Sequence, residues 1–162
     1  MRLALTLTAA TLAVALAGCS KPSAPAGGAS PAAAPAPVSA ADRQKLLAAL
    51  PAPYNAGDLT NGEAKFALCR SCHTIEPGGA NMTGPNLHGV FGKPAASAAE
   101  FKYSDALKGA GIVWDADHLS QWLEKPQTYL PGTKMTFAGL KEAKDRTDLI
   151  AYLMVETGPA PQ

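Results

Sequence analysis

Cysteine is scarce in this sequence. The only three cysteines are Cys19, Cys69 and Cys72, and one of them lies far from the other two. So few and so unevenly spaced, they exclude the disulfide framework of a small secreted scaffold. Each cysteine therefore needs its own explanation.

An excess of charge of one sign is also lacking. Fourteen basic residues stand against thirteen acidic ones, and from Tyr54 onward the counts are ten and twelve. No basic stripe runs along the chain, so nucleic acid is not an expected partner.

Aromatic residues are absent from the first third of the chain. Every Trp, Phe and Tyr lies at or after Tyr54, whereas alanine and proline are concentrated before it. The core-forming material is therefore confined to about 100 residues, near the lower end of a comfortable single domain. We expect one domain at residues 54–158, and a domain this small gains much from an internal prosthetic group.

A long hydrophobic run is missing too. The apolar run from Leu3 to Leu16 is shorter than the roughly 20 residues that span a bilayer. Preceded by Arg2, it is typical of a secretory leader. Leu16-Ala17-Gly18-Cys19 resembles the bacterial lipobox, which predicts a signal peptide at 1–18 and lipidation of Cys19. The alternative is an ordinary cleaved signal that leaves Cys19 as a stray thiol.

The composition of residues 19–53 predicts a tether. Ser20 to Val38 is almost wholly Ala, Pro, Gly and Ser, a composition that cannot form a packed core. Ser39 is placed to cap a short helix that runs to about Leu50, to which no function is attached. We expect a periplasmic protein held by lipid at the inner membrane, with the outer membrane as the alternative.

The sequence predicts an all-α domain in which long loops separate the helices. From Thr74 to Lys102 the sequence is rich in Gly, Pro and Asn and lacks strand alternation. A loop of this length is unusual in a compact domain unless it serves a function, such as wrapping a cofactor. Apolar periodicity predicts helices at about 59–69, 104–108, 116–124, 127–130 and 141–156.

The strongest short signal is Cys69-Arg70-Ser71-Cys72-His73. Its spacing is that of c-type haem attachment, in which two thiols bond the porphyrin and the adjacent histidine binds iron. A redox dithiol would need a thioredoxin-like order of strand and helix. Half a zinc site would need a second ligand pair. Neither is present, so the motif predicts one covalently attached haem c.

Iron bound by His73 needs a second axial group or an open site. The candidates in the mature chain are His88, His118, Met82, Met135 and Met154. Met154 lies on the last predicted helix, where filling the core is the usual role of methionine. Met135 follows a rigid Pro131-Gly132 corner that can aim its thioether, and spacing favours it.

These stretches make the domain resemble a class I cytochrome c, near the mitochondrial and bacterial soluble-carrier subgroup. The matching residues are Gly57, Asp58, Gly62, Phe66, 69–73, 83–89, 91–93, 101–104, 111–114, 129–135, 137–139, Arg146 and 148–153.

The resemblance implies that Met135 is the distal ligand and that the carbonyl of Pro85 accepts a hydrogen bond from His73. It also implies that Tyr103 and Trp114 donate to a haem propionate. Trp114 is equally compatible with a plain role in the core. With Met135 as the ligand, we expect His88 to have a structural role and His118 to be a surface residue.

Several positions depart from the family pattern. Lys93 stands where arginine is usual, Leu107 replaces a polar residue, and Trp122 replaces a tyrosine. Positions that are commonly basic in the family carry Gln127, Thr128 and Glu142 here. The docking face, the surface with which family members contact their partners, therefore has fewer lysines than usual.

The function that the resemblance implies is one-electron transfer by a monomer, not enzyme catalysis. The donor would be a cytochrome bc1-type complex and the acceptor a terminal oxidase or similar complex, in a respiratory or photosynthetic membrane. A haem peroxidase and a gas sensor are the alternatives, and both need a distal ligand that dissociates readily.

Overall fold

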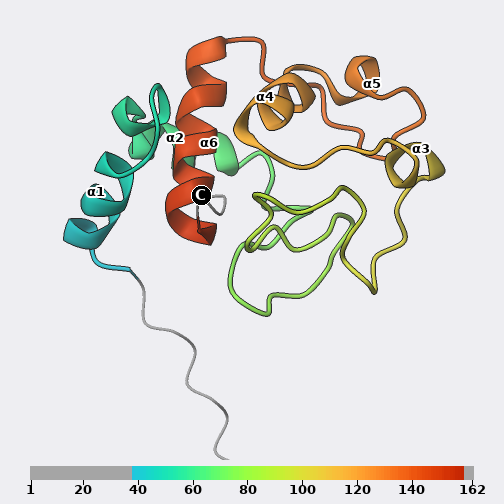
Figure 1. The fold of residues 1–162 in the computed structure, drawn as a ribbon, viewed down its shortest axis with the longest axis horizontal. Helices are drawn as coiled ribbons and strands as arrows, with labels where there is room; N and C mark the ends of the chain where they lie inside the picture. The colour runs from blue at the N-terminus through green and yellow to red at the C-terminus, as the bar shows by residue number, and fades with distance from the viewer. Residues whose placement is uncertain (1–37, 159–162) are drawn as a thin grey trace, which may run out of the picture. The chain divides into compact units, whose positions relative to one another are not determined.

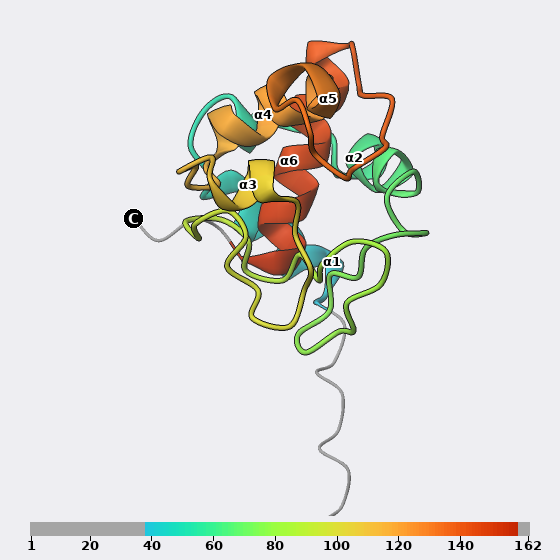
Figure 2. The same ribbon diagram turned by 90° about the vertical axis from the view of Figure 1, so that its right-hand side faces the viewer.

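The computed structural model describes residues 38–158, and within that range it is all-α without a named strand. The predicted leader at 1–18, Cys19 and the tether up to residue 37 lie outside the described residues. The elements are α1 (Ala40–Ala48), a 3-10 turn η1 (Tyr54–Ala56), α2 (Leu59–Phe66), α3 (Asp105–Lys108), α4 (Ala116–Glu124), α5 (Pro126–Tyr129) and α6 (Ala143–Thr157) (Figures 1 and 2). The all-α prediction is confirmed.

The centre of the fold is the crossing of α2 and α6. Gly62 makes it possible, because a Cβ on this residue would stand 2.6 Å from the Cβ of Tyr152 and closer still to the carbonyl oxygen of Asp148. One turn later the ring of Phe66 packs against Tyr152, with 5.7 Å between centroids. Leu149 is fully buried in the same core.

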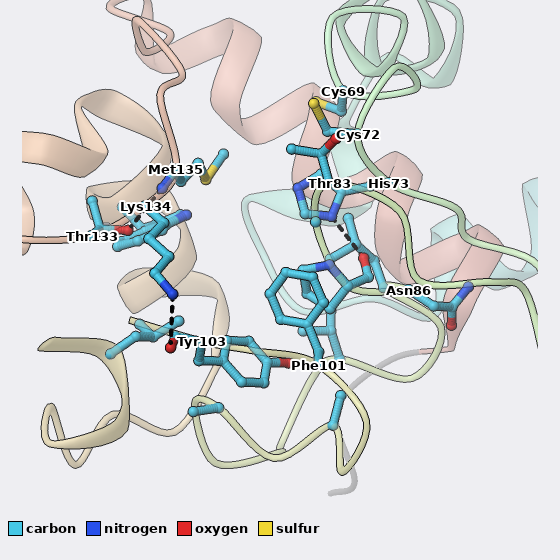
Figure 3. A pocket seen from close by; sticks show the side chains of 18 of the residues that line it. Cys69, Cys72, His73, Thr83, Asn86, Phe101, Tyr103, Thr133, Lys134 and Met135 are labelled. Carbon is cyan, nitrogen blue, oxygen red and sulfur yellow. Dashed lines mark hydrogen bonds between the residues drawn. The ribbon is translucent and has the colours of Figure 1, made fainter. Parts of the chain in front are cut away.

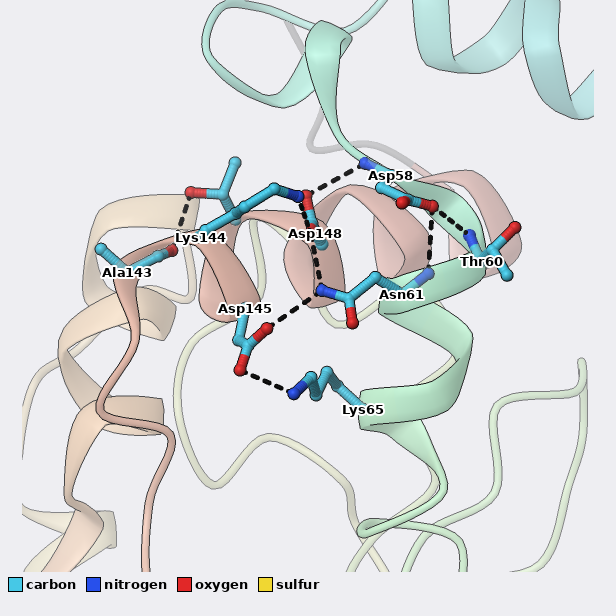
Figure 4. A network of polar contacts seen from close by, with 9 residues as sticks. Asp58, Thr60, Asn61, Lys65, Ala143, Lys144, Asp145 and Asp148 are labelled. Atoms are coloured by element: carbon cyan, nitrogen blue, oxygen red, sulfur yellow. Dashed lines mark hydrogen bonds and ion pairs between the residues drawn. The ribbon is translucent and has the colours of Figure 1, made fainter.

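A polar network ties the N-terminal end of α2 to α6 (Figure 4). Asp148 is only 2% exposed, and it accepts hydrogen bonds from the backbone N–H of Asp58 at 3.0 Å, from Asn61 Nδ2 at 2.7 Å and from Lys144 Nζ at 2.6 Å. Burial opposes its ionisation, but these donors prevail and lower the pKa of the carboxyl group. The network therefore holds a carboxylate at the helix crossing.

Helix α1 packs on α6 rather than standing apart as a piece of tether. Ser39 caps it, accepting from the N–H of Asp42, and Leu47 and Leu50 are buried in the common core. Arg43 pairs with Glu156 at 2.7 Å. The packed unit thus extends N-terminal to residue 54, where composition alone places the start of the domain.

The chain between α2 and α3 contains no helix and lies beneath α3 and α4 in both views (Figures 1 and 2). Backbone hydrogen bonds pin its second half: Gly92 donates to Trp114 at 2.8 Å, Trp114 to Lys93 at 2.9 Å, and Ala95 to Ile112 at 2.7 Å. These hydrogen bonds hold the long loop in a defined conformation. Within residues 38–158 no helix combines the length and the apolar character needed to cross a membrane.

Candidate haem site

The cysteine motif directly follows α2 and continues it as a run of tight turns. The N–H of Cys72 and the N–H of His73 both donate to the carbonyl of Cys69, at 3.0 and 2.9 Å. The sequence pattern predicts a first helix that reaches Cys69, but the regular α-helix α2 ends at Phe66. The turns bring both thiols and the imidazole to one wall of a cavity of about 590 Å³, a size typical of small-molecule and cofactor pockets.

His73 is held from behind by the loop at 84–85. Its Nδ1 lies 2.7 Å from the carbonyl oxygen of Pro85, which can only accept, so Nδ1 carries the proton and Nε2 keeps its lone pair. Gly84 lies flat against the ring, where a Cβ would come within 2.6 Å of Nε2. Burial lowers the pKa of His73, partly offset by the bond to Pro85. The imidazole is therefore neutral, as a metal ligand must be.

The two thiols are free and half-buried. Burial, with Cys72 beside it, raises the pKa of Cys69 to about 11. A thiol so hard to ionise is a poor nucleophile in dithiol exchange, which counts against the redox-dithiol alternative. The zinc alternative also finds no support, because within residues 38–158 no three His, Cys, Asp or Glu side chains are grouped to hold a metal ion.

Met135 lies across the cavity from His73 (Figure 3). The backbone of Met135 makes two hydrogen bonds. Its N–H donates to Thr133 Oγ1 at 3.2 Å, and its carbonyl accepts from Gln127 Nε2 at 2.6 Å. Gly139, at φ 98°, lets the loop pass directly against the C-terminal end of α4, where a Cβ would collide with the carbonyl of Glu124.

The other candidate ligands are placed differently. Met82 is exposed and Met154 is buried in α6, and neither lines the cavity. His118 lies at the surface with 43% of its side chain exposed, and its Nδ1 is 2.8 Å from the carboxylate of Asp115, the N-cap of α4. His88 does line the cavity, but its Nδ1 is engaged with the carbonyl of Ile75 at 3.1 Å.

Aromatic side chains close the end of the cavity away from the thiols. Tyr103 packs edge-on against Phe101, with 4.7 Å between centroids, and burial raises the pKa of its hydroxyl, which stays a donor. Trp114 is buried and packs edge-on against Trp122 at 5.4 Å. Lys93 also lines the cavity, with its ammonium 3.5 Å from the carbonyl of His88.

Comparison with known proteins decides the family. The family model described as cytochrome c matches residues 59–155. The chain belongs to the cytochrome c family. A cytochrome c of Gibberella zeae is 50% identical over 102 residues, which are 62% of this chain and 96% of the relative. That of Kluyveromyces lactis is 45% identical over 106 residues, 65% of this chain and 96% of the relative. That of Arabidopsis thaliana is 49% identical over 102 residues, 62% and 91% of the two chains.

Members of this family are electron carriers that hold a covalently attached haem c, so this cytochrome is an electron carrier and not an enzyme. The residues present fit that group. Two thiols, a neutral imidazole with a free lone pair and a thioether all line one cavity with a mainly hydrophobic and aromatic wall. Gly84 leaves just enough room for the imidazole to lie flat against the loop.

The sequence does not predict the contacts that three residues make in this site. Gln127 and Thr133, which fasten the Met135 loop, and Gly84, which backs His73, carry no signal of periodicity or spacing. The family pattern marks Gln127 only as a position that is commonly basic. Its contact with a residue eight positions further along depends on how the loop turns back.

Proposed function

We propose that this cytochrome carries single electrons between membrane complexes through a haem ligated by His73 and Met135. The observation that carries the proposal is the meeting of these two side chains, far apart in sequence, in one cavity with both thiols. Bound there, the haem supplies a one-electron change of iron valence, and the His/Met pair favours a fairly high potential.

The protein's own residues prepare the site. Cys69 and Cys72 anchor the porphyrin, and Pro85 orients His73 through the 2.7 Å contact to Nδ1. Met135 would supply the second protein ligand of the iron, which would leave peroxide or a gas molecule no ready access to the metal. Tyr103 and Trp114 would donate to a propionate, and their place in the wall of the same cavity supports this role.

We propose a domain order of a signal peptide at 1–18, lipidated Cys19 followed by a tether, and a haem domain that begins before residue 54, because α1 packs on α6, and runs to residue 158. The lipobox-like Leu16-Ala17-Gly18-Cys19 supports this order. Anchoring would hold the monomer on the periplasmic side of the inner membrane and raise its effective concentration near its partners. A bc1-type complex would donate electrons, and a terminal oxidase or similar complex would accept them in brief contacts of small area.

The ligand set is tested by the absorption spectrum of the oxidised haem protein. Sulfur bound to Fe(III) gives a weak long-wavelength band, which we expect in the wild type and expect to vanish in Met135→Ala. Met82→Ala is the matched control, because Met82 is exposed and lies outside the cavity lining. A wild type without the band at neutral pH would favour the peroxidase or gas sensor. A band that survives in Met135→Ala would refute the choice of methionine.

The tether is tested by fractionation of cells that express the full chain. Cys19→Ser should move the cytochrome from the membrane fraction to the soluble periplasmic fraction, whereas Ser20→Ala should not. Equal membrane association of both variants would refute lipid anchoring at Cys19.

A further inference from the structure

Gln127 occupies an unexpected place beside the Met135 loop. This glutamine lies near the start of α5, and its side-chain amide donates to the carbonyl of Met135 at 2.6 Å and to the carbonyl of Thr133 at 3.3 Å. Both acceptors belong to the loop that carries the thioether. We propose that Gln127 is a positioning residue that holds this loop closed, so that the Met135 thioether stays on the metal. This inference rests on the proposed ligation by Met135.

The Gln127 side chain projects from a turn of helix that is held in place. Helix α5 begins at Pro126, which is fully buried, and the N–H of Leu130 closes the turn onto the carbonyl of Pro126 at 2.9 Å. The proline ring and the buried position limit how far this turn can move. Gln127 therefore ties the Met135 loop, which contains no helix, to a turn that is held in place.

Gln127 supplies the hydrogen bonds that these two loop carbonyls accept. Among residues 38–158 no second donor reaches the carbonyl of either Thr133 or Met135. Gly132 and Gly139, at φ 88° and 98°, lie on either side of Met135 in backbone conformations that glycine adopts without strain. On the other side of the loop the hydrogen bonds are longer: Lys134 Nζ lies 3.4 Å from the carbonyl oxygens of both Lys102 and Tyr103.

A lysine could not reproduce the arrangement fully. The planar amide offers two N–H groups in fixed directions, which suits two neighbouring carbonyls, whereas an ammonium is a strongly hydrated point charge. The glutamine at this position thus has a function of its own, beyond the absence of a basic residue from the docking face.

The test uses the full-length haem protein and imidazole as a probe that competes with Met135 for the metal. Gln127→Glu keeps the shape but replaces the donor by a carboxylate that faces two carbonyl oxygens. Loss of one or two hydrogen bonds should raise the apparent affinity for imidazole about fivefold. Thermal unfolding followed by far-UV circular dichroism should change little, because Gln127 is exposed.

Gln121→Glu is the matched control. It makes the same chemical change at an exposed position, and within the described part of the chain the Gln121 side chain makes no hydrogen bond. We expect its imidazole affinity to equal that of the wild type. Equal affinities of Gln127→Glu and Gln121→Glu would overturn the proposal.

Amide hydrogen exchange across residues 130–139 is the second readout and does not depend on which group binds the metal. Gln127→Glu should accelerate exchange in this segment and leave α2 and α6 unchanged. If the wild type lacks the long-wavelength band, ligation by Met135 fails and exchange alone decides whether Gln127 restrains the loop. If the band is present but exchange matches that of Gln121→Glu, the restraint fails and the ligation stands.

Discussion

Replacing Gly62 by alanine should force α2 and α6 apart. The added Cβ would stand 2.6 Å from the Cβ of Tyr152, and it would also collide with the carbonyl of Asp148. These atoms belong to the backbone and to the root of a side chain, so no rotamer change relieves the contact. The helices themselves have to move, and the pair Phe66–Tyr152 and the polar network on Asp148 move with them.

The expected cost follows from two opposing effects. Overpacking a well-packed core costs about 1–3 kcal/mol, and a backbone collision places this case at the upper end. Alanine in place of glycine within a helix returns about 1 kcal/mol. The net loss of unfolding free energy is therefore about 2 kcal/mol, which for a domain of this size lowers the melting temperature by about 8 °C.

Urea unfolding of the haem protein, followed by far-UV circular dichroism, measures this loss. Gly109→Ala is the control, because Gly109 has right-handed backbone angles and its Cβ would lie 3.4 Å from the nearest atom, the carbonyl oxygen of Asp105. We expect a change within about 0.5 kcal/mol there. A Gly62→Ala variant as stable as Gly109→Ala would refute the close approach of α2 and α6.

Three further substitutions test other parts of the structure. The lowered pKa of Asp148 means that its ionised form stabilises the fold above the ordinary carboxyl pKa of about 4, and that this contribution is lost as the pH falls below it. Asp148→Asn should therefore unfold at lower urea at pH 7 and show a flatter decline between pH 5 and 3, and parallel declines would contradict this. Leu47→Ala should cost about 2 kcal/mol in urea unfolding and leave the haem spectrum unchanged, and an unaltered midpoint would mean that α1 does not pack on α6. Gly84→Ala should displace the imidazole of His73 and lower the haem content of the purified protein, and full haem content with a wild-type spectrum would contradict the packing of the loop on the ring.

Local patterns predicted most of the helices. The helix at 116–124 has the predicted bounds and Ser39 caps α1 as predicted, whereas Ser104, predicted as the first residue of a helix at 104–108, is the N-cap of α3. The last helix begins two residues later than predicted. These features depend on side chains a few positions apart, so the sequence is sufficient to locate them.

The role of α1 could not be predicted in the same way. Its neighbours in sequence are rich in alanine and proline, which made residues 39–50 look like part of a tether. The structure buries Leu47 and Leu50 and pairs Arg43 with Glu156 on α6. That interface joins the first and last described helices, and no local pattern records it.

The attachment of haem is encoded within five consecutive residues, because both thiols and the proximal imidazole need only one turn of chain to come together. Spacing and the resemblance already favour Met135 as the second sulfur, but how its loop is held opposite His73 depends on tertiary contacts: Pro126 is buried, Gln127 reaches back to the Met135 loop and Gly139 passes against α4. Such contacts are made by segments that meet only after the chain has folded. The amino-acid sequence therefore determines that this protein binds haem, and the packing of its loops decides how firmly the second ligand is held.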